Sequence, residues 1–90
     1  MNDYTQYAGK PIFLTSCIKG FSRRDKKPGW IISFEYNELI IKHLKKAVHK
    51  NHHEWDRKAK TWWISELYED VLDELFDNWY SLAKRQGTLF

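Results

Sequence analysis

Apolar and polar residues alternate along two segments in the first half of this chain, and a period of two residues is typical of β-strands. The segments are residues 11–18 and residues 30–36. The first is expected to direct Ile12, Leu14 and Ser16 to one side and Phe13, Thr15 and Cys17 to the other. The apolar side of the second consists of Trp30, Ile32, Phe34 and Tyr36. We expect these strands to pair antiparallel, joined by a basic, turn-rich loop over residues 19–29.

Two later segments repeat apolar residues at spacings of three and four, which predicts amphipathic helices. The first helix is expected to begin after Asn37, a favourable N-cap residue, and to run to about Lys50. Its buried side is expected to hold Ile40, Ile41, Leu44, Ala47 and Val48. The second is expected to begin after Ser65 and to continue as a single helix to near Gly87. Its apolar stripe consists of Tyr68, Val71, Leu72, Leu75, Phe76, Trp79, Leu82 and Ala83.

Between the two helices, residues 54–56 and 61–65 read as short strands closed by a basic turn, residues 57–60. The element order is therefore ββαββα, in one small α+β domain over residues 1–90, with residues 1–9 expected to fray. Each helix has one apolar stripe, and the strand over residues 30–36 offers one apolar face. We therefore expect an antiparallel sheet with both helices on the same face.

The composition is that of a small folded domain. Aromatic residues make up 17% of the chain, well above the content of disordered sequences. Because Cys17 is the only cysteine, no disulfide can form within the chain, and a reducing, cytoplasmic location is expected. No signal-peptide pattern is present and no apolar stretch reaches the roughly 20 residues that span a bilayer, so no membrane partner is expected.

Charge is distributed unevenly along the chain. Residues 10–60 contain 13 basic and 5 acidic residues, whereas residues 61–83 contain six acidic residues and no basic one. The molecule is therefore expected to have a basic side and an acidic side.

The basic side also carries tryptophans, and cations combined with flat aromatic surfaces suit nucleic acid. The candidate phosphate contacts are Arg23, Arg24, Lys26, Lys27, Lys42, Lys45, Lys46, Arg57, Lys58 and Lys60. Trp62 and Trp63 are adjacent in a strand and must point to opposite faces. We expect Trp63 to be the more exposed and to stack on a base. The alternative is that Trp63 packs against Trp55 or a flanking loop and only braces the hairpin.

Neither a metal site nor a catalytic site is expected. His49, His52 and His53 are closely spaced, but zinc needs three or four ligands in a fixed geometry, and Cys17 lies far away on a strand. The acidic residues of the last helix recur at helical spacing, as on an ordinary solvated face. No Ser-His-Asp or Cys-His arrangement stands out. The chain is therefore expected to need no cofactor and to be no enzyme.

Two motifs carry a resemblance to a known family. The segment F-E-Y-N-E-L-I-I-K-H-L-K-K (residues 34–46) is followed by W-D-R-K-A-K-T-W (residues 55–62) and an apolar helix. Over residues 30–76 this pattern resembles the HARP domain, a small module attached to annealing helicases and similar to the DNA-binding domain of phage branched-DNA helicases. The resemblance implies binding to DNA at forks or single-strand junctions. This chain departs from such helicases because it has no G-x-x-x-x-G-K-[ST] phosphate loop and no room for two motor lobes.

Two functions from different classes follow. The first is a stand-alone module that binds single-stranded or branched DNA, as an accessory to a helicase or recombination factor. The alternative is a small phage-type adaptor or inhibitor that binds a host or phage protein through its acidic last helix. The acidic contact residues would then be Glu66, Glu69, Asp70, Asp73, Glu74 and Asp77.

Overall fold

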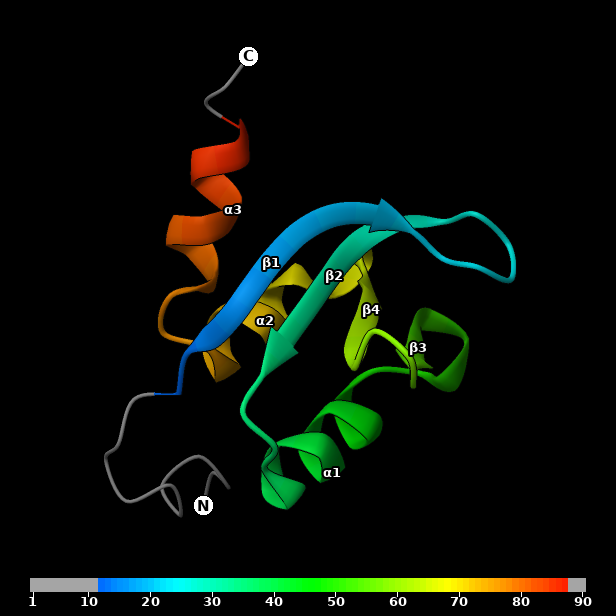
Figure 1. The fold of residues 1–90 in the computed structure, drawn as a ribbon, viewed down its shortest axis with the longest axis horizontal. Coiled ribbons are helices and arrows are strands. Elements are labelled where there is room, and N and C mark those ends of the chain that lie inside the picture. Colours follow the sequence, from blue (N-terminus) through cyan, green and yellow to red (C-terminus); the bar gives the residue numbers. More distant parts are fainter. Residues whose placement is uncertain (1–11, 88–90) are drawn as a thin grey trace.

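The computed structural model describes residues 12–87, which form a four-stranded antiparallel sheet with three α-helices (Figure 1). The strand order across the sheet is β1-β2-β4-β3. The expectation that residues 1–9 fray lies outside the described part of the chain.

The elements follow the expected order, except that the last helix is divided into two and two 3-10 helices, η2 and η3, are added. The first half contains β1 (Leu14–Phe21), β2 (Pro28–Phe34), α1 (Glu38–Ala47) and η2 (Lys50–His52). The second half contains β3 (His53–Asp56), β4 (Thr61–Ser65), η3 (Glu66–Tyr68), α2 (Glu69–Leu75) and α3 (Trp79–Gly87). The α+β class and the antiparallel sheet are confirmed.

One face of the sheet carries the core. The buried strand residues on this face are Leu14, Cys17, Trp30, Ile32, Trp62 and Ile64. The helices add Ile40, Leu44, Leu72, Leu75 and Trp79 to the same cluster, as does Val48 directly after α1, so all three helices pack on this face. The Trp79 ring meets the Trp30 ring edge to face, with centroids 5.8 Å apart, and α3 lies beside β1 (Figure 1).

The side-chain alternation expected for the first strand is wrong from Ser16 onward, so the expected sides of Ser16 and Cys17 are exchanged. A register shift between Leu14 and Ser16 in the β1–β2 pairing places an additional residue in β1, as a β-bulge does. Leu14 and Cys17 are therefore both buried on the core face, while Ser16 is exposed. Burial raises the pKa of the Cys17 thiol to about 11.

Helix α1 begins as expected and ends earlier. The Asn37 side chain accepts hydrogen bonds from the backbone amides of Leu39 and Ile40, which satisfies amides that have no partner within the helix. The helix ends at Ala47, since Val48 is already extended. Ala47 is exposed, so its expected place on the buried side is wrong.

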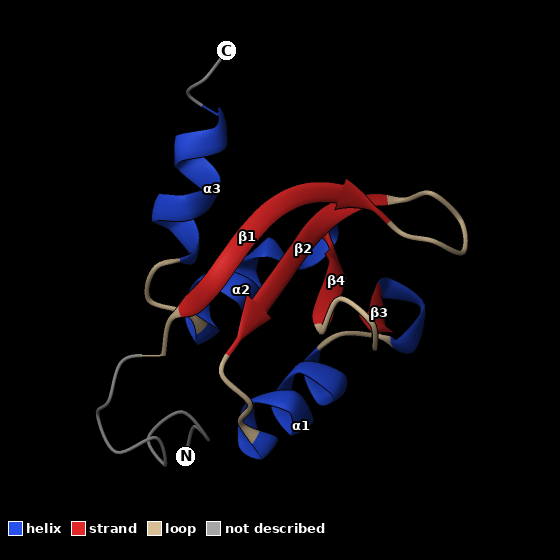
Figure 2. Ribbon diagram, viewed as in Figure 1, coloured by secondary structure: helices blue, strands red, loops and turns tan. Residues whose placement is uncertain are grey.

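The last helical region is divided, contrary to the expected single helix. Figure 2 shows α2 and α3 as separate helices joined by a loop. In this loop the Asn78 side chain bonds to the backbone of β1: Leu14 N donates to Asn78 Oδ1 (2.8 Å), and Asn78 Nδ2 donates to Leu14 O (3.0 Å). The backbone amide of Asp77 donates to Ile12 O. The break therefore gives the edge strand β1 hydrogen-bond partners that a continuous helix would withhold.

Candidate nucleic-acid interface

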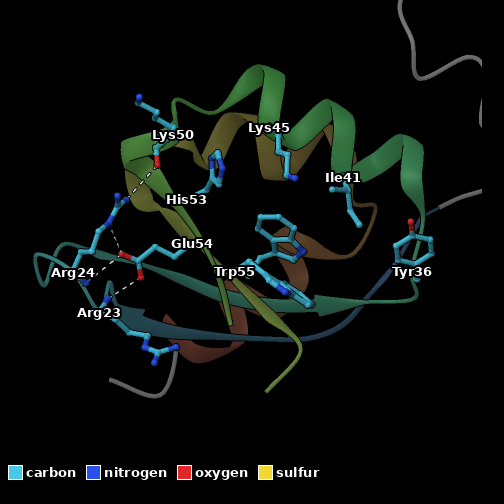
Figure 3. Close-up of a pocket in the computed structure, with 10 residues that line it drawn as sticks. Arg23, Arg24, Tyr36, Ile41, Lys45, Lys50, His53, Glu54 and Trp55 are labelled. Carbon is cyan, nitrogen blue, oxygen red and sulfur yellow. Dashed lines mark hydrogen bonds and ion pairs between the residues drawn. The ribbon is translucent and has the colours of Figure 1, made fainter. Parts of the chain in front are cut away.

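An open groove of about 770 Å³ runs between α1 and the β3–β4 hairpin. Figure 3 shows Arg23, Arg24, Glu54 and Lys50 at one end, Tyr36 at the other and Trp55 between them. Helix α1 directs Ile41 and Lys45, one turn apart, into the groove. The remaining lining residues are His53 and Trp62.

The floor of the groove is a pair of tryptophans. Trp55 and Trp62 are register partners in the antiparallel β3–β4 pair, so their side chains lie on the same face. Their ring centroids are 5.1 Å apart. Trp62 is 6% exposed and belongs to the core, whereas Trp55 is 48% exposed and presents indole surface to solvent.

A second hollow of about 360 Å³ continues the groove around Trp55. It shares Tyr36, Ile41, Trp55 and Trp62 with the first, and it adds Phe34, Arg57 and Lys60. Cations therefore lie on both sides of the exposed tryptophan: Lys45 and Lys50 in the first hollow, and Arg57 and Lys60 in the second.

The lysines of α1 differ in their position relative to the groove. Lys45 lines the groove, with Nζ 5.9 Å from the centroid of the Trp62 ring, within cation–π range. Lys42 and Lys46 are exposed and line neither hollow. A rotation of about 100° per residue around the helix turns Lys46 away from Lys45, whereas Lys42 lies one turn before Lys45, toward the start of α1.

The basic loop, residues 22–27, is held against β3. The Glu54 carboxylate accepts hydrogen bonds from the backbone amides of Arg23 (2.8 Å) and Arg24 (3.2 Å). It also forms an ion pair with Arg24 Nε at 3.3 Å. The Arg24 guanidinium also donates to Lys50 O, and Arg23 lies 3.4 Å from an Asp56 oxygen. Both arginines thus reach the groove, but the side chain of each is paired with a carboxylate, Asp56 for Arg23 and Glu54 for Arg24.

The two lysines of this loop lie outside the groove. Lys27 Nζ pairs with Asp25 at 3.3 Å. Lys26 is exposed and has a left-handed backbone, with φ of 59°. Neither lysine lines either hollow.

The hairpin turn, residues 57–60, is organised by Asp56. Its carboxylate accepts hydrogen bonds from Ala59 N and Lys58 N, and these bonds, with the nearby Arg23, lower the pKa of Asp56 from its ordinary value. The turn closes with Lys60 in the left-handed region, at φ of 57°. Arg57 and Lys60 line the second hollow, whereas Lys58 is exposed outside it.

The expectation that Trp63 is exposed is wrong, because Trp63 is 5% exposed. It points to the sheet face opposite Trp62, where its indole N–H donates to Gly20 O at 3.2 Å. A side chain at Gly29 would clash, since a Cβ there would lie 2.6 Å from Trp63 Nε1. Trp63 is thus buried against the glycine backbone of β1 and β2, and this burial agrees with the alternative that Trp63 is a structural residue.

The histidines serve local structure. His49 Nδ1 accepts the backbone amide of Asn51, and His53 Nδ1 lies 3.2 Å from Val48 O. Burial is the main cause that lowers the pKa of His53, and the charge of Lys45 acts in the same direction. Among the described residues, no group of three His, Cys, Asp or Glu residues is arranged to hold a metal ion.

Not all of the acidic residues in the last third of the chain are available to contact a protein partner. Glu69 accepts a hydrogen bond from the Trp30 indole at 2.8 Å, so this carboxylate supports the core. The others are exposed on η3, on α2 and in the loop after it: Glu66, Asp70, Asp73, Glu74 and Asp77.

The groove residues that the sequence did not mark as candidate contacts include Tyr36, Lys50, Glu54 and Trp55. The position of Trp55 could have been predicted from the turn over residues 57–60. This turn pairs Asp56 with Thr61 and therefore places Trp55 opposite Trp62. No local pattern marks Glu54 or Lys50. Their place in the groove depends on the docking of the loop over residues 22–27, which is distant in the sequence.

Comparisons of the chain with protein-family models, with curated proteins and with solved structures give no match. The resemblance to the HARP domain therefore stays a prediction. Within residues 12–87, no helix has the length and apolar character needed to cross a membrane.

Proposed function

We propose that this protein binds single-stranded or branched DNA in the groove between α1 and the β3–β4 hairpin. The observation that carries the proposal is the position of Trp55. It is a half-exposed indole backed by a buried one, with cations on both sides along the same groove. This arrangement suits an unpaired base and the phosphates that flank it.

Stacking on Trp55 selects for unpaired bases. The face of a base is available in a single strand, a loop or a fork, whereas in duplex DNA it is covered by neighbouring pairs. Trp55 is held by the β3–β4 register and by Trp62 beneath it, so little side-chain freedom is lost on binding. Tyr36, exposed at the far end of the groove, offers a second aromatic surface.

The charges of the groove suit a phosphate backbone. Lys45, Lys50, Arg57 and Lys60 line it without an ion pair to an acidic side chain among the described residues. The acidic exposed residues of α2 belong to another part of the surface and line neither hollow. Backbone contacts of this kind carry little sequence information, so binding is expected to tolerate any sequence.

The same proposal assigns the chain a role as an accessory factor. A groove of aromatic rings and cations binds DNA without transforming it, and the chain has no phosphate-loop motif with which to drive unwinding. We place it in the cytoplasm beside a helicase or recombination factor that acts on the same unpaired DNA.

Fluorescence anisotropy tests the proposal with three labelled probes: an oligothymidine single strand, a forked duplex and a blunt duplex. We expect the single strand and the fork to bind more tightly than the blunt duplex. With four groove cations on phosphates, log affinity for the single strand should fall against log salt with a slope of roughly −3. Equal binding to the blunt duplex would contradict stacking. No binding to any probe would favour the adaptor alternative, with its acidic protein-binding surface.

A further inference from the structure

The cationic end of the groove contains an anion-binding turn. The successive backbone amides of Arg23 and Arg24 point at one carboxylate, that of Glu54, and the Arg24 side chain reaches the same oxygen as its own amide. Two convergent amides with a guanidinium form the kind of concavity that binds phosphate in many proteins. In this chain, an acidic side chain of the protein itself fills it.

The turn does not depend on Glu54 for its shape. Ser22 N donates to Lys27 O at 2.9 Å, and Lys26 N donates to Ser22 O at 3.2 Å. The buried Ser22 hydroxyl accepts from Lys27 N at 2.9 Å and bonds to the Asp25 carboxylate. Since these bonds close the loop over residues 22–27 on itself, its amides stay convergent when the carboxylate leaves.

We propose that the amides of Arg23 and Arg24, with the Arg24 guanidinium, form a phosphate subsite that the Glu54 carboxylate occupies until a phosphate group displaces it. The subsite opens into the groove, because Arg23, Arg24, Lys50 and Glu54 all line it (Figure 3). The inference rests on the proposed function in one respect: the phosphate belongs to the DNA strand whose base stacks on Trp55.

Glu54 then makes binding weaker than the groove would otherwise allow. The Glu54 side chain is 14% exposed, so its charge acts at short range on an entering phosphate with little screening by solvent. A phosphate that binds here must break the hydrogen bonds of the Glu54 carboxylate. It is then repelled by the negative charge of the displaced carboxylate, which stays nearby. Removal of the charge, without a change in side-chain shape, should therefore strengthen binding.

The test compares Glu54→Gln with the wild-type chain, with Glu66→Gln as the matched control. Glu66 is exposed on η3 and lines neither hollow, and its substitution changes the net charge by the same amount. We expect Glu54→Gln to bind the oligothymidine strand about tenfold more tightly, with a salt slope steeper by roughly 0.7 for one additional phosphate contact. The control should stay within about twofold of wild type.

Amide NMR provides a second measurement, which begins with the wild-type chain. Addition of the oligothymidine strand to the wild-type chain should move the amide signals of Arg23 and Arg24. Inorganic phosphate should move the same two signals more in Glu54→Gln than in wild type. Unchanged or weaker strand binding by a folded Glu54→Gln, or amides of Arg23 and Arg24 that stay still in the wild-type titration, would overturn the proposal. If no strand binds but phosphate still moves these amides, the subsite stands and the proposed function fails.

Discussion

Trp55 lies on Trp62 with ring centroids 5.1 Å apart, yet the first ring is half exposed and the second is almost completely buried. One tryptophan thus supports the other at the boundary between core and groove. The lower ring fixes the position of the upper ring, and the upper ring leaves one aromatic face for a ligand. Within one strand pair, Trp55 is therefore available for binding, whereas Trp62 contributes to stability.

We expect Trp55→Ala to weaken binding of the oligothymidine strand by about 1–3 kcal/mol, because the base loses its stacking surface. Anisotropy titrations measure this loss. Tyr80→Ala is the control, since Tyr80 is an exposed aromatic residue on α3 that lines neither hollow. Wild-type affinity in Trp55→Ala would show that the groove is not the binding site.

Trp63→Ala is expected to behave in the opposite way. Truncation of this buried ring should lower the free energy of unfolding by about 3–5 kcal/mol, and the hydrogen bond to Gly20 O is lost with it. Urea denaturation measures the change, with Trp55→Ala as the comparison. Below its melting temperature, Trp63→Ala should bind the strand as wild type does. A midpoint close to wild type would contradict the packing described for this residue.

Lys45→Glu should reduce strand affinity about tenfold more than Lys46→Glu, although the two substitutions change the net charge equally. The reason is position: Lys45 lies in the groove over Trp62, and Lys46 lies outside it. Anisotropy at several salt concentrations distinguishes a lost contact from a general charge effect. Equal losses would show that α1 acts only through its summed charge.

The helices and strands were largely predictable because each depends on nearby residues. The alternation of apolar and polar residues predicted β2, and the N-cap preference of Asn37 predicted the start of α1. The basic turn predicted the β3–β4 hairpin. The bulge in β1 and the break between α2 and α3 were not predictable in this way. They meet at one interaction, between Leu14 and Asn78, which are 64 residues apart.

The exposure of the tryptophans was unpredictable for a similar reason. Strand alternation separates Trp62 from Trp63 but does not say what covers either face. Trp63 is covered because Gly20 on β1 and Gly29 on β2 let its indole approach their backbone. A hydrophobic pattern within one segment contains no information on such contacts between strands.

Asn78→Ala should lower the free energy of unfolding by about 1–3 kcal/mol, since it leaves both the amide and the carbonyl of Leu14 without this partner. Asn51→Ala, at an exposed position on η2, is the control. Urea denaturation of both variants provides the comparison. If Asn78→Ala were as stable as the control, the side chain would not be what holds the break between α2 and α3 against β1.

The carboxylate of Asp56 should make stability depend on pH. Its pKa is lowered in the folded state, chiefly by the Ala59 amide, so its stabilising contribution is present above the unfolded pKa of about 4. The contribution is lost as pH falls through the lower folded pKa. We expect Asp56→Asn to be less stable than wild type at pH 7 and the difference to disappear in acid. Thermal melts across this range, with Asp73→Asn as control, measure it; a difference independent of pH would contradict the assignment.

The strand order β1-β2-β4-β3 has a consequence for how the chain reaches its fold. Each outer strand pairs with its neighbour in sequence through a short connection, residues 22–27 or residues 57–60, so both hairpins close small loops. The central pairing of β2 with β4 spans α1 and closes a longer loop, which has a larger entropic cost. We therefore expect two hairpins to form early and independently, and the rate-limiting step to be their union along β2 and β4, when Trp30 first meets Ile64.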